Sequence, residues 1–184
     1  SSGRLGFGAS RTMQIAQKLY QGIEIDGETI GLITYMRTDG TNLSADAIDT
    51  FRKYIKGEFG EEYIPDTPAN YTGKKAKNAQ EAHEAIRPTD IMRVPDTIKK
   101  YLSPDQHKLY DLIWSRALSS QMKPAQFDRN TITIISDDDG TVCKTSGSVI
   151  KFDGFLKVMK DTKKDDDEDI LPEVNKGPVN IEAL

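Results

Sequence analysis

The sequence predicts an α+β protein in which a mainly helical part is followed by a β-rich part. In the first two thirds of the chain, apolar residues recur at intervals of three and four, the spacing of amphipathic helices. After Pro124 they recur at every second residue, which is typical of strands, and Asp139-Gly140 marks a hairpin turn. The change of period predicts a boundary near residues 120–126. We therefore expect one domain over residues 1–121 and a second over residues 122–184.

The first predicted helix begins at Ser10, whose hydroxyl suits an N-cap, and ends at Gly22. A turn at Asp26-Gly27 then leads into a short apolar strand over residues 30–34. The residues that follow this strand, beginning with Tyr35, therefore lie at its carboxyl end.

Two further helices are predicted with defined starts. Ser44 caps one that places Phe51 and Ile55 on a single face, and Ser103-Pro104 begins another that runs to about Leu118. Between them, residues 65–80 are basic and aperiodic, which predicts a loop. A short helical piece is expected over residues 81–86, stopped by the proline that follows.

The charge of the chain is unevenly distributed. Residues 161–169 hold six acidic side chains and two lysines, which accounts for the whole formal net charge of −4. We expect this run to be a solvated loop. The net charge therefore does not exclude a nucleic-acid partner for the rest of the chain.

Cysteine content and hydropathy limit the cellular setting. Cys143 is the single cysteine, so no internal disulfide is possible, and we expect a reducing cytoplasm. No apolar run approaches the roughly 20 residues that span a bilayer, so no membrane partner is expected.

The stretch GLITYMRTDGTNLS, residues 31–44, carries the clearest chemistry. Its apolar strand ends at Tyr35, and Arg37, Thr38 and Asp39 follow at once. A tyrosine hydroxyl attacks phosphorus only when cations stabilise the developing charge, and Arg37 is an always-protonated donor that suits a phosphate. By itself this pattern also fits an ordinary core or surface tyrosine.

The stretch QEAHEAIRPTD, residues 80–90, is the second candidate. On the helix predicted there, His83 and Arg87 share a face, and both donate hydrogen bonds to phosphate. By itself the pattern fits an ordinary helix histidine better than a functional one. One histidine beside Glu81 and Glu84 is weak support for a metal site.

Three stretches in this order and spacing resemble the type IA DNA topoisomerase family, in its bacterial topoisomerase I form. They are LGFGASRTMQIAQKLYQG from residue 5, GLITYMRTDGTNLS and QEAHEAIRPTD. The likeness continues through LYDLIWSRALSSQMKPAQFD and on to ILPEVNKGPVNIEAL, so it covers essentially the whole chain.

The resemblance implies roles for individual residues. Tyr35 matches the nucleophile that forms a 5′-phosphotyrosyl link with single-stranded DNA, and Arg37 matches the arginine at the scissile phosphate. His83 matches a histidine of the DNA-binding pocket, and Asp39 an aspartate that pairs with it. Arg87 and Thr38 are expected to support phosphate binding.

The resemblance also implies an architecture and partners. Residues 1–121 would form a mainly helical, winged-helix or helix-turn-helix-like domain with the catalytic tyrosine, and residues 122–184 part of a β-rich arch. Family members relax negatively supercoiled DNA with Mg²⁺, which an acidic cluster in a separate Toprim domain holds. Nothing in this sequence matches that cluster, so we expect a piece of a larger bacterial enzyme, inactive alone, without bound metal, whose partners are DNA and the remaining domains. A non-catalytic winged-helix DNA-binding module is the alternative.

Overall fold

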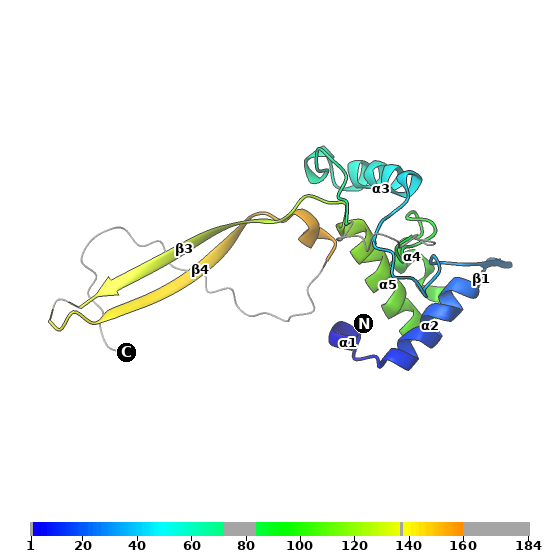
Figure 1. Cartoon of the computed structure of the whole chain (residues 1–184), viewed down its shortest axis with the longest axis horizontal. Helices are drawn as coiled ribbons and strands as arrows, with labels where there is room; N and C mark the ends of the chain where they lie inside the picture. Colours follow the sequence, from blue (N-terminus) through cyan, green and yellow to red (C-terminus); the bar gives the residue numbers. More distant parts are fainter. Residues whose placement is uncertain (1, 72–83, 137, 160–184) are drawn as a thin grey trace, which may run out of the picture. The chain divides into compact units, whose positions relative to one another are not determined.

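The computed structural model describes residues 2–71, 84–136 and 138–159 (Figure 1). They form two compact units. The first contains the described residues up to Pro124 together with residues 154–159, and the second contains the described residues of the stretch Ala125–Asp153. Helices and small antiparallel sheets are both present, so the predicted α+β class is confirmed. The winged-helix-like character stays a prediction.

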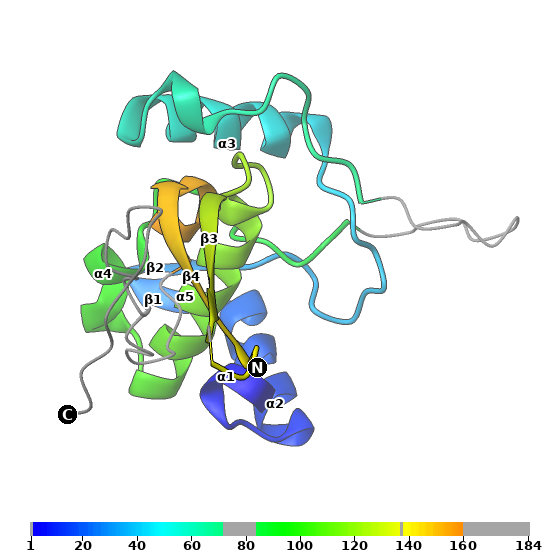
Figure 2. The same cartoon turned by 90° about the vertical axis from the view of Figure 1, so that its left-hand side faces the viewer.

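The first unit holds the helices and one short hairpin. In chain order its elements are α1 (Ser2–Leu5), α2 (Ala9–Gln21), β1 (Ile23–Ile25), β2 (Glu28–Ile30), α3 (Ala45–Glu58), η1 (Glu61–Tyr63), α4 (Pro95–Ile98), η2 (Lys99–Tyr101), α5 (Pro104–Ser119) and η3 (Gly154–Lys157). Helices α2 and α5 lie against each other in both views (Figures 1 and 2).

Two of the three predicted helix starts are confirmed. Ser44 caps α3 by accepting a hydrogen bond from the backbone N–H of Ala47, and Ser103 forms a capping box with Gln106 at the start of α5. The prediction that Ser10 caps the first helix is wrong. Helix α2 begins at Ala9 after Gly8, whose carbonyl accepts hydrogen bonds from the backbone N–H (2.9 Å) and the hydroxyl of Thr12 (3.0 Å).

The turn at Asp26-Gly27 joins β1 to β2 as an antiparallel hairpin. Both turn residues have positive φ, 51° and 89°, which matches the primed turns that suit the twist of paired strands. The strand predicted over residues 30–34 is shorter than expected, because β2 ends at Ile30. Beyond it, Ile33 forms an isolated antiparallel bridge with Pro88.

The core of the first unit is built from α2, α3, α5 and the segments that cross them. Its most deeply buried members are Tyr110, Phe51, Leu19, Leu32, Ile33, Ile55, Ile91 and Leu118. The polar atoms of its large aromatics are satisfied: the Tyr110 hydroxyl donates to the carbonyl of Arg93 (2.8 Å), and the Trp114 indole N–H donates to that of Ile91 (2.9 Å). Burial raises the pKa of Tyr110 far above its ordinary value, so it remains a donor.

The second unit is a two-stranded antiparallel ribbon of β3 (Gln126–Ile135) and β4 (Val142–Phe152), as the alternating pattern predicted. The register runs from Ile135 opposite Val142 to Gln126 opposite Phe152, with an irregularity beside Gln126. Its large apolar side chains are mainly exposed, and the buried apolar residues of the described chain all belong to the first unit. The ribbon therefore relies on its backbone ladder and cross-strand pairs.

The helix predicted over residues 81–86 is not formed in its described part. Residues 84–87 are non-helical, because Pro88 disfavours helical geometry before it and because their backbone groups pair with other segments. Residues 65–71 are irregular as predicted. The rest of the basic loop, the acidic run at residues 161–169 and residues 81–83 lie outside the described residues. Among the described helices, none has the length and apolar character needed to cross a bilayer.

The corrected position of the first helix cap is testable. Replacing Ser103 with alanine removes a cap, so we expect the free energy of unfolding to fall by about 1 kcal/mol. The matched Ser10→Ala change should not lower it, because Ser10 lies inside α2, where alanine is favoured. Urea denaturation followed by far-UV circular dichroism measures both. A loss of stability in Ser10→Ala equal to that in Ser103→Ala would contradict the assignment.

Candidate active site

The segment that leads into Tyr35 is fixed against helix α2. The backbone N–H of Leu32 donates to the carbonyl of Leu19 at 2.7 Å. Gly31 permits this close approach, since a Cβ at that position would lie 2.7 Å from the carbonyl oxygen of Tyr20. The start of the candidate site is therefore anchored to the core before Tyr35 is reached.

The same segment pairs on its other side with residues 85–89. The backbone N–H of Thr34 donates to the carbonyl of Arg87 (2.9 Å), and that of Thr89 donates to the carbonyl of Leu32 (3.0 Å). The hydroxyl of Thr34 donates to the carbonyl of Ala85 (2.9 Å) and accepts from the backbone N–H of Arg87 (3.0 Å). Tyr35 thus follows a short extended segment, held by these bonds and one bridge and not by a full strand.

Tyr35 itself is half-buried and packs against the edge of the core. Its ring meets that of Tyr20 from α2 edge-on, with centroids 5.4 Å apart and an interplanar angle of 68°. The next residue, Met36, is only 7% exposed. A buried neighbour and an aromatic contact together restrict the position of the Tyr35 ring.

The polar residues after Tyr35 lie on an irregular loop. Arg37 and Asp39 are exposed, which leaves a guanidinium and a carboxylate at the surface two and four residues beyond the tyrosine. Thr38 is half-buried, and its hydroxyl accepts a hydrogen bond from the backbone N–H of Gly40 at 2.9 Å. Thr38 therefore shapes the loop that carries the other two.

Arg87 is paired with a carboxylate. Its guanidinium donates from Nε and Nη2 to the two oxygens of Glu84, at 3.0 and 2.8 Å, and from Nη1 to the carbonyl of Pro88 at 2.9 Å. Glu84 also accepts from the backbone N–H of Ser44 at 3.2 Å. The sequence suggested a shared helix face with His83 and overlooked this pair, although a glutamate three residues before an arginine was a usable signal.

The environment of Glu84 favours its charged form. Partial burial opposes ionisation, but the hydrogen bonds and charge of Arg87 and the hydrogen bonds from Ser44 outweigh it and lower the pKa of Glu84 below its ordinary value of 4.5. His83 lies outside the described residues, so its position relative to Tyr35 and Arg37 is not described.

Comparison with known proteins shows what the chain is similar to. A family model described as DNA topoisomerase matches residues 1–183. The chain belongs to the type IA DNA topoisomerase family. DNA topoisomerase 1 of Rickettsia bellii is 50% identical over 166 residues, which are 90% of this chain and 21% of that protein. DNA topoisomerase 1 of Salmonella typhimurium is 45% identical over 177 residues, or 96% of this chain and 19% of that protein.

A solved topoisomerase structure agrees with the fold. Full-length topoisomerase I from Thermotoga maritima superposes with a TM-score of 0.74 and 39% sequence identity, covering 98% of this chain and 26% of that one. Our chain spans about a fifth of the length of the curated relatives that it matches.

The described part of the chain does not fit a magnesium site. Within residues 2–71, 84–136 and 138–159, no three histidine, cysteine or carboxylate side chains gather where a metal ion would bind. Glu84, the acidic residue nearest to His83 in the described sequence, already forms an ion pair with Arg87 and accepts a hydrogen bond from Ser44. The described residues therefore offer no ligand set for a metal-assisted step.

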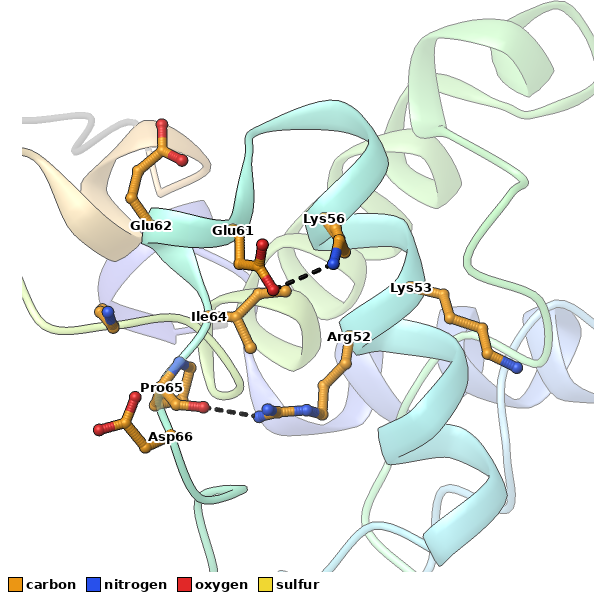
Figure 3. Close-up of a pocket in the computed structure, with 9 residues that line it drawn as sticks. Arg52, Lys53, Lys56, Glu61, Glu62, Ile64, Pro65 and Asp66 are labelled. Atoms are coloured by element: carbon orange, nitrogen blue, oxygen red, sulfur yellow. Dashed lines mark hydrogen bonds and ion pairs between the residues drawn. The ribbon is translucent and has the colours of Figure 1, made fainter.

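A groove of about 550 Å³ lies elsewhere in the first unit, between α3 and η1 (Figure 3). Within it, Arg52 donates to the carbonyl of Pro65 (2.9 Å) and Lys56 pairs with Glu61 (3.0 Å). None of Tyr35, Arg37, Thr38, Asp39 and Arg87 lines it. Its charges are mixed and partly neutralised internally, so it is distinct from the tyrosine loop.

The lowered pKa of Glu84 makes a prediction about stability. A carboxyl whose folded pKa lies below its unfolded value stabilises the protein above pH 4.5, and this contribution is lost as the pH falls through the folded pKa. We expect Glu84→Gln to lower the melting temperature at pH 7, and the difference from the wild type to shrink as the pH falls below 4.5 and the carboxyl becomes protonated in both the folded and the unfolded state.

Thermal denaturation across this pH range measures the effect. Glu61→Gln is the matched control, because Glu61 pairs with Lys56 while both side chains are exposed, and such pairs contribute little. A difference between wild type and Glu84→Gln that stays constant with pH would contradict the role given to the carboxylate.

Proposed function

We propose that this chain is the tyrosine-bearing part of a DNA topoisomerase that cleaves one DNA strand at a time. The hydroxyl oxygen of Tyr35 attacks a phosphodiester, a bond forms from that oxygen to phosphorus, and the bond to the 3′ oxygen breaks. The tyrosine proton passes to a base, and the leaving 3′ oxygen gains a proton. The proposal rests on one observation: a tyrosine fixed at the end of an anchored segment, directly before a loop with an exposed arginine, in a chain of this family.

Arg37 serves in this proposal as the donor that neutralises the charge developing on the phosphate. Its guanidinium is always protonated and exposed, and it lies two residues from Tyr35. Asp39 and His83 act as a pair that binds the DNA backbone, as the resemblance implies. Thr38 holds the loop through Gly40, and Arg87 supports the site from its pair with Glu84.

The covalent link conserves the energy of the broken phosphodiester, so the 3′ hydroxyl reseals the strand without ATP. Negatively supercoiled or single-stranded DNA is the proposed substrate, in a bacterial cytoplasm at the nucleoid. Mg²⁺ is proposed for the whole enzyme, with its ligands on other domains. Residues 1–121 are proposed as the tyrosine domain and residues 122–184 as part of the arch.

The first test asks whether the chain forms a covalent adduct. Alone, incubated with single-stranded DNA and Mg²⁺, it should form none, because the metal-binding carboxylates are proposed to lie on other domains. A chimera in which it replaces the matching stretch of the Rickettsia bellii topoisomerase should form an adduct and relax supercoiled plasmid. Denaturing gel electrophoresis detects the adduct.

Tyr35→Phe in the chimera provides the control, since it removes one oxygen atom and keeps the ring contact with Tyr20. It should abolish the adduct while single-strand binding persists. Persistent adduct in Tyr35→Phe would refute the nucleophile. An adduct from the isolated chain that Tyr35→Phe abolishes would refute its inactivity. Binding without any adduct in the wild-type chimera would favour the non-catalytic DNA-binding module.

The second test concerns the phosphate contact of Arg37. Single-strand binding by the chimera should weaken steeply with salt, and Arg37→Ala should reduce the slope of log K against log salt by about 0.7, the contribution of one phosphate contact. Arg116→Ala, which removes an exposed arginine from α5, should leave the slope unchanged. Fluorescence anisotropy over a salt series measures both, and equal slopes in wild type and Arg37→Ala would refute the contact.

A further inference from the structure

The loop over residues 35–43 has both of its ends tied to the same short segment, residues 84–87. This loop carries Tyr35, Arg37 and Asp39 and has no helix or strand of its own. Residues 84–87 lie more than forty positions further along the chain. These four residues, 84–87, contact the loop at both of its ends.

The first end of the loop is held at Thr34. Its backbone N–H and its hydroxyl make three hydrogen bonds, of 2.9, 2.9 and 3.0 Å, to the backbone groups of Ala85 and Arg87. Two of these bonds use the side chain, so the threonine anchors the loop more firmly than a backbone pair alone would.

The second end is held at Asn42 and Ser44. The backbone N–H of Ala85 donates to the carbonyl of Asn42 (2.9 Å), and the backbone N–H of Ser44 donates to the carboxylate of Glu84 (3.2 Å). Ser44 is also the N-cap of α3, so the carboxylate links the loop to the start of that helix. Ala85 therefore contacts both ends of the loop.

The Glu84–Arg87 ion pair closes this arrangement. The two side chains are 29% and 16% exposed, and their bidentate contact spans the segment that holds both ends of the loop. The third guanidinium contact, to the carbonyl of Pro88, fixes the arginine to the backbone beside the bridge with Ile33. Loss of either side chain leaves a partly buried charge without its partner, which is costly.

We propose that Glu84 and Arg87 are positioning residues, which act as one unit to hold the Tyr35 loop in the geometry needed to attack a phosphodiester. The inference rests on the proposed function of Tyr35. A nine-residue loop without secondary structure samples many conformations, and misplacement of a reacting group by about 1 Å costs about 100-fold in rate. The ion pair limits this sampling without itself touching the DNA.

The first measurement follows the loop in the 184-residue chain. Glu84→Ala, Arg87→Ala and the double variant should each speed amide hydrogen exchange at Thr34 and Ala85 by at least tenfold. Lys56→Ala/Glu61→Ala is the matched control, because it removes another ion pair from the same unit and touches neither end of the loop. Unchanged protection in the Glu84 and Arg87 variants would overturn the proposal.

The second measurement follows chemistry in the Rickettsia bellii chimera described above. The single and double variants should each slow formation of the adduct at least tenfold and by the same factor, because the pair works as a unit. In a Tyr35→Phe background, the same variants should change the affinity for single-stranded DNA less than twofold. Arg87→Lys keeps the charge but not the bidentate contact, so it should fold normally and lose rate to an intermediate extent.

A merely stabilising pair would lower the melting temperature and leave the cleavage rate per folded molecule unchanged, and this result would overturn the proposal. A loss of DNA affinity that matches the loss of rate would also overturn it, since Arg87 would then be a phosphate ligand. If the wild-type chimera forms no adduct, the proposed function fails and this inference fails with it. If the wild-type chimera forms the adduct and the Glu84 and Arg87 variants form it at the same rate, the proposed function stands and this inference alone fails.

Discussion

The antiparallel contact between residues 31–34 and residues 85–89 is the constraint on which the candidate site depends. It consists of the bridge between Ile33 and Pro88 and the backbone hydrogen bonds on either side of it. Since Leu32 and Ile33 are also fully buried, the contact is shielded from water and its hydrogen bonds are costly to break. Tyr35 follows this contact directly in the sequence, so its backbone is held on that side.

Three parts of the chain that are distant in sequence meet around that contact. Helix α2 supplies the carbonyl of Leu19 and the ring of Tyr20, the cap of α3 supplies the N–H of Ser44, and the segment before α4 supplies Glu84 and Arg87. The loop with Arg37 and Asp39 projects from this frame. Rigid support beneath an exposed polar loop is the arrangement expected where a reacting group must be placed accurately.

The two units owe their structure to different interactions. The helical unit is held by a buried core with satisfied polar atoms at Tyr110 and Trp114. In the ribbon of β3 and β4, side chains such as Ile135 and Val149 stay exposed, and the strands are held by their hydrogen-bond ladder. The two units together span about a fifth of the length of the curated relatives that the chain matches.

The sequence by itself determined the elements whose signals are local. Hydrophobic period, the caps at Ser44 and Ser103 and the turns at Asp26-Gly27 and Asp139-Gly140 depend on neighbours within a few residues. Three sequence stretches in a fixed order, one of them around Tyr35, together indicated the family. Tertiary structure decided the rest. Residues 84–87 have a helix-like sequence pattern but are not helical. Pro88 disfavours a helix before it, and their hydrogen-bond partners Thr34, Asn42 and Ser44 lie 40 or more positions away. Likewise, only the folded structure shows that Arg87 contacts the carboxylate of Glu84 and the carbonyl of Pro88, because the pairing of a charge depends on what the folded chain brings near it.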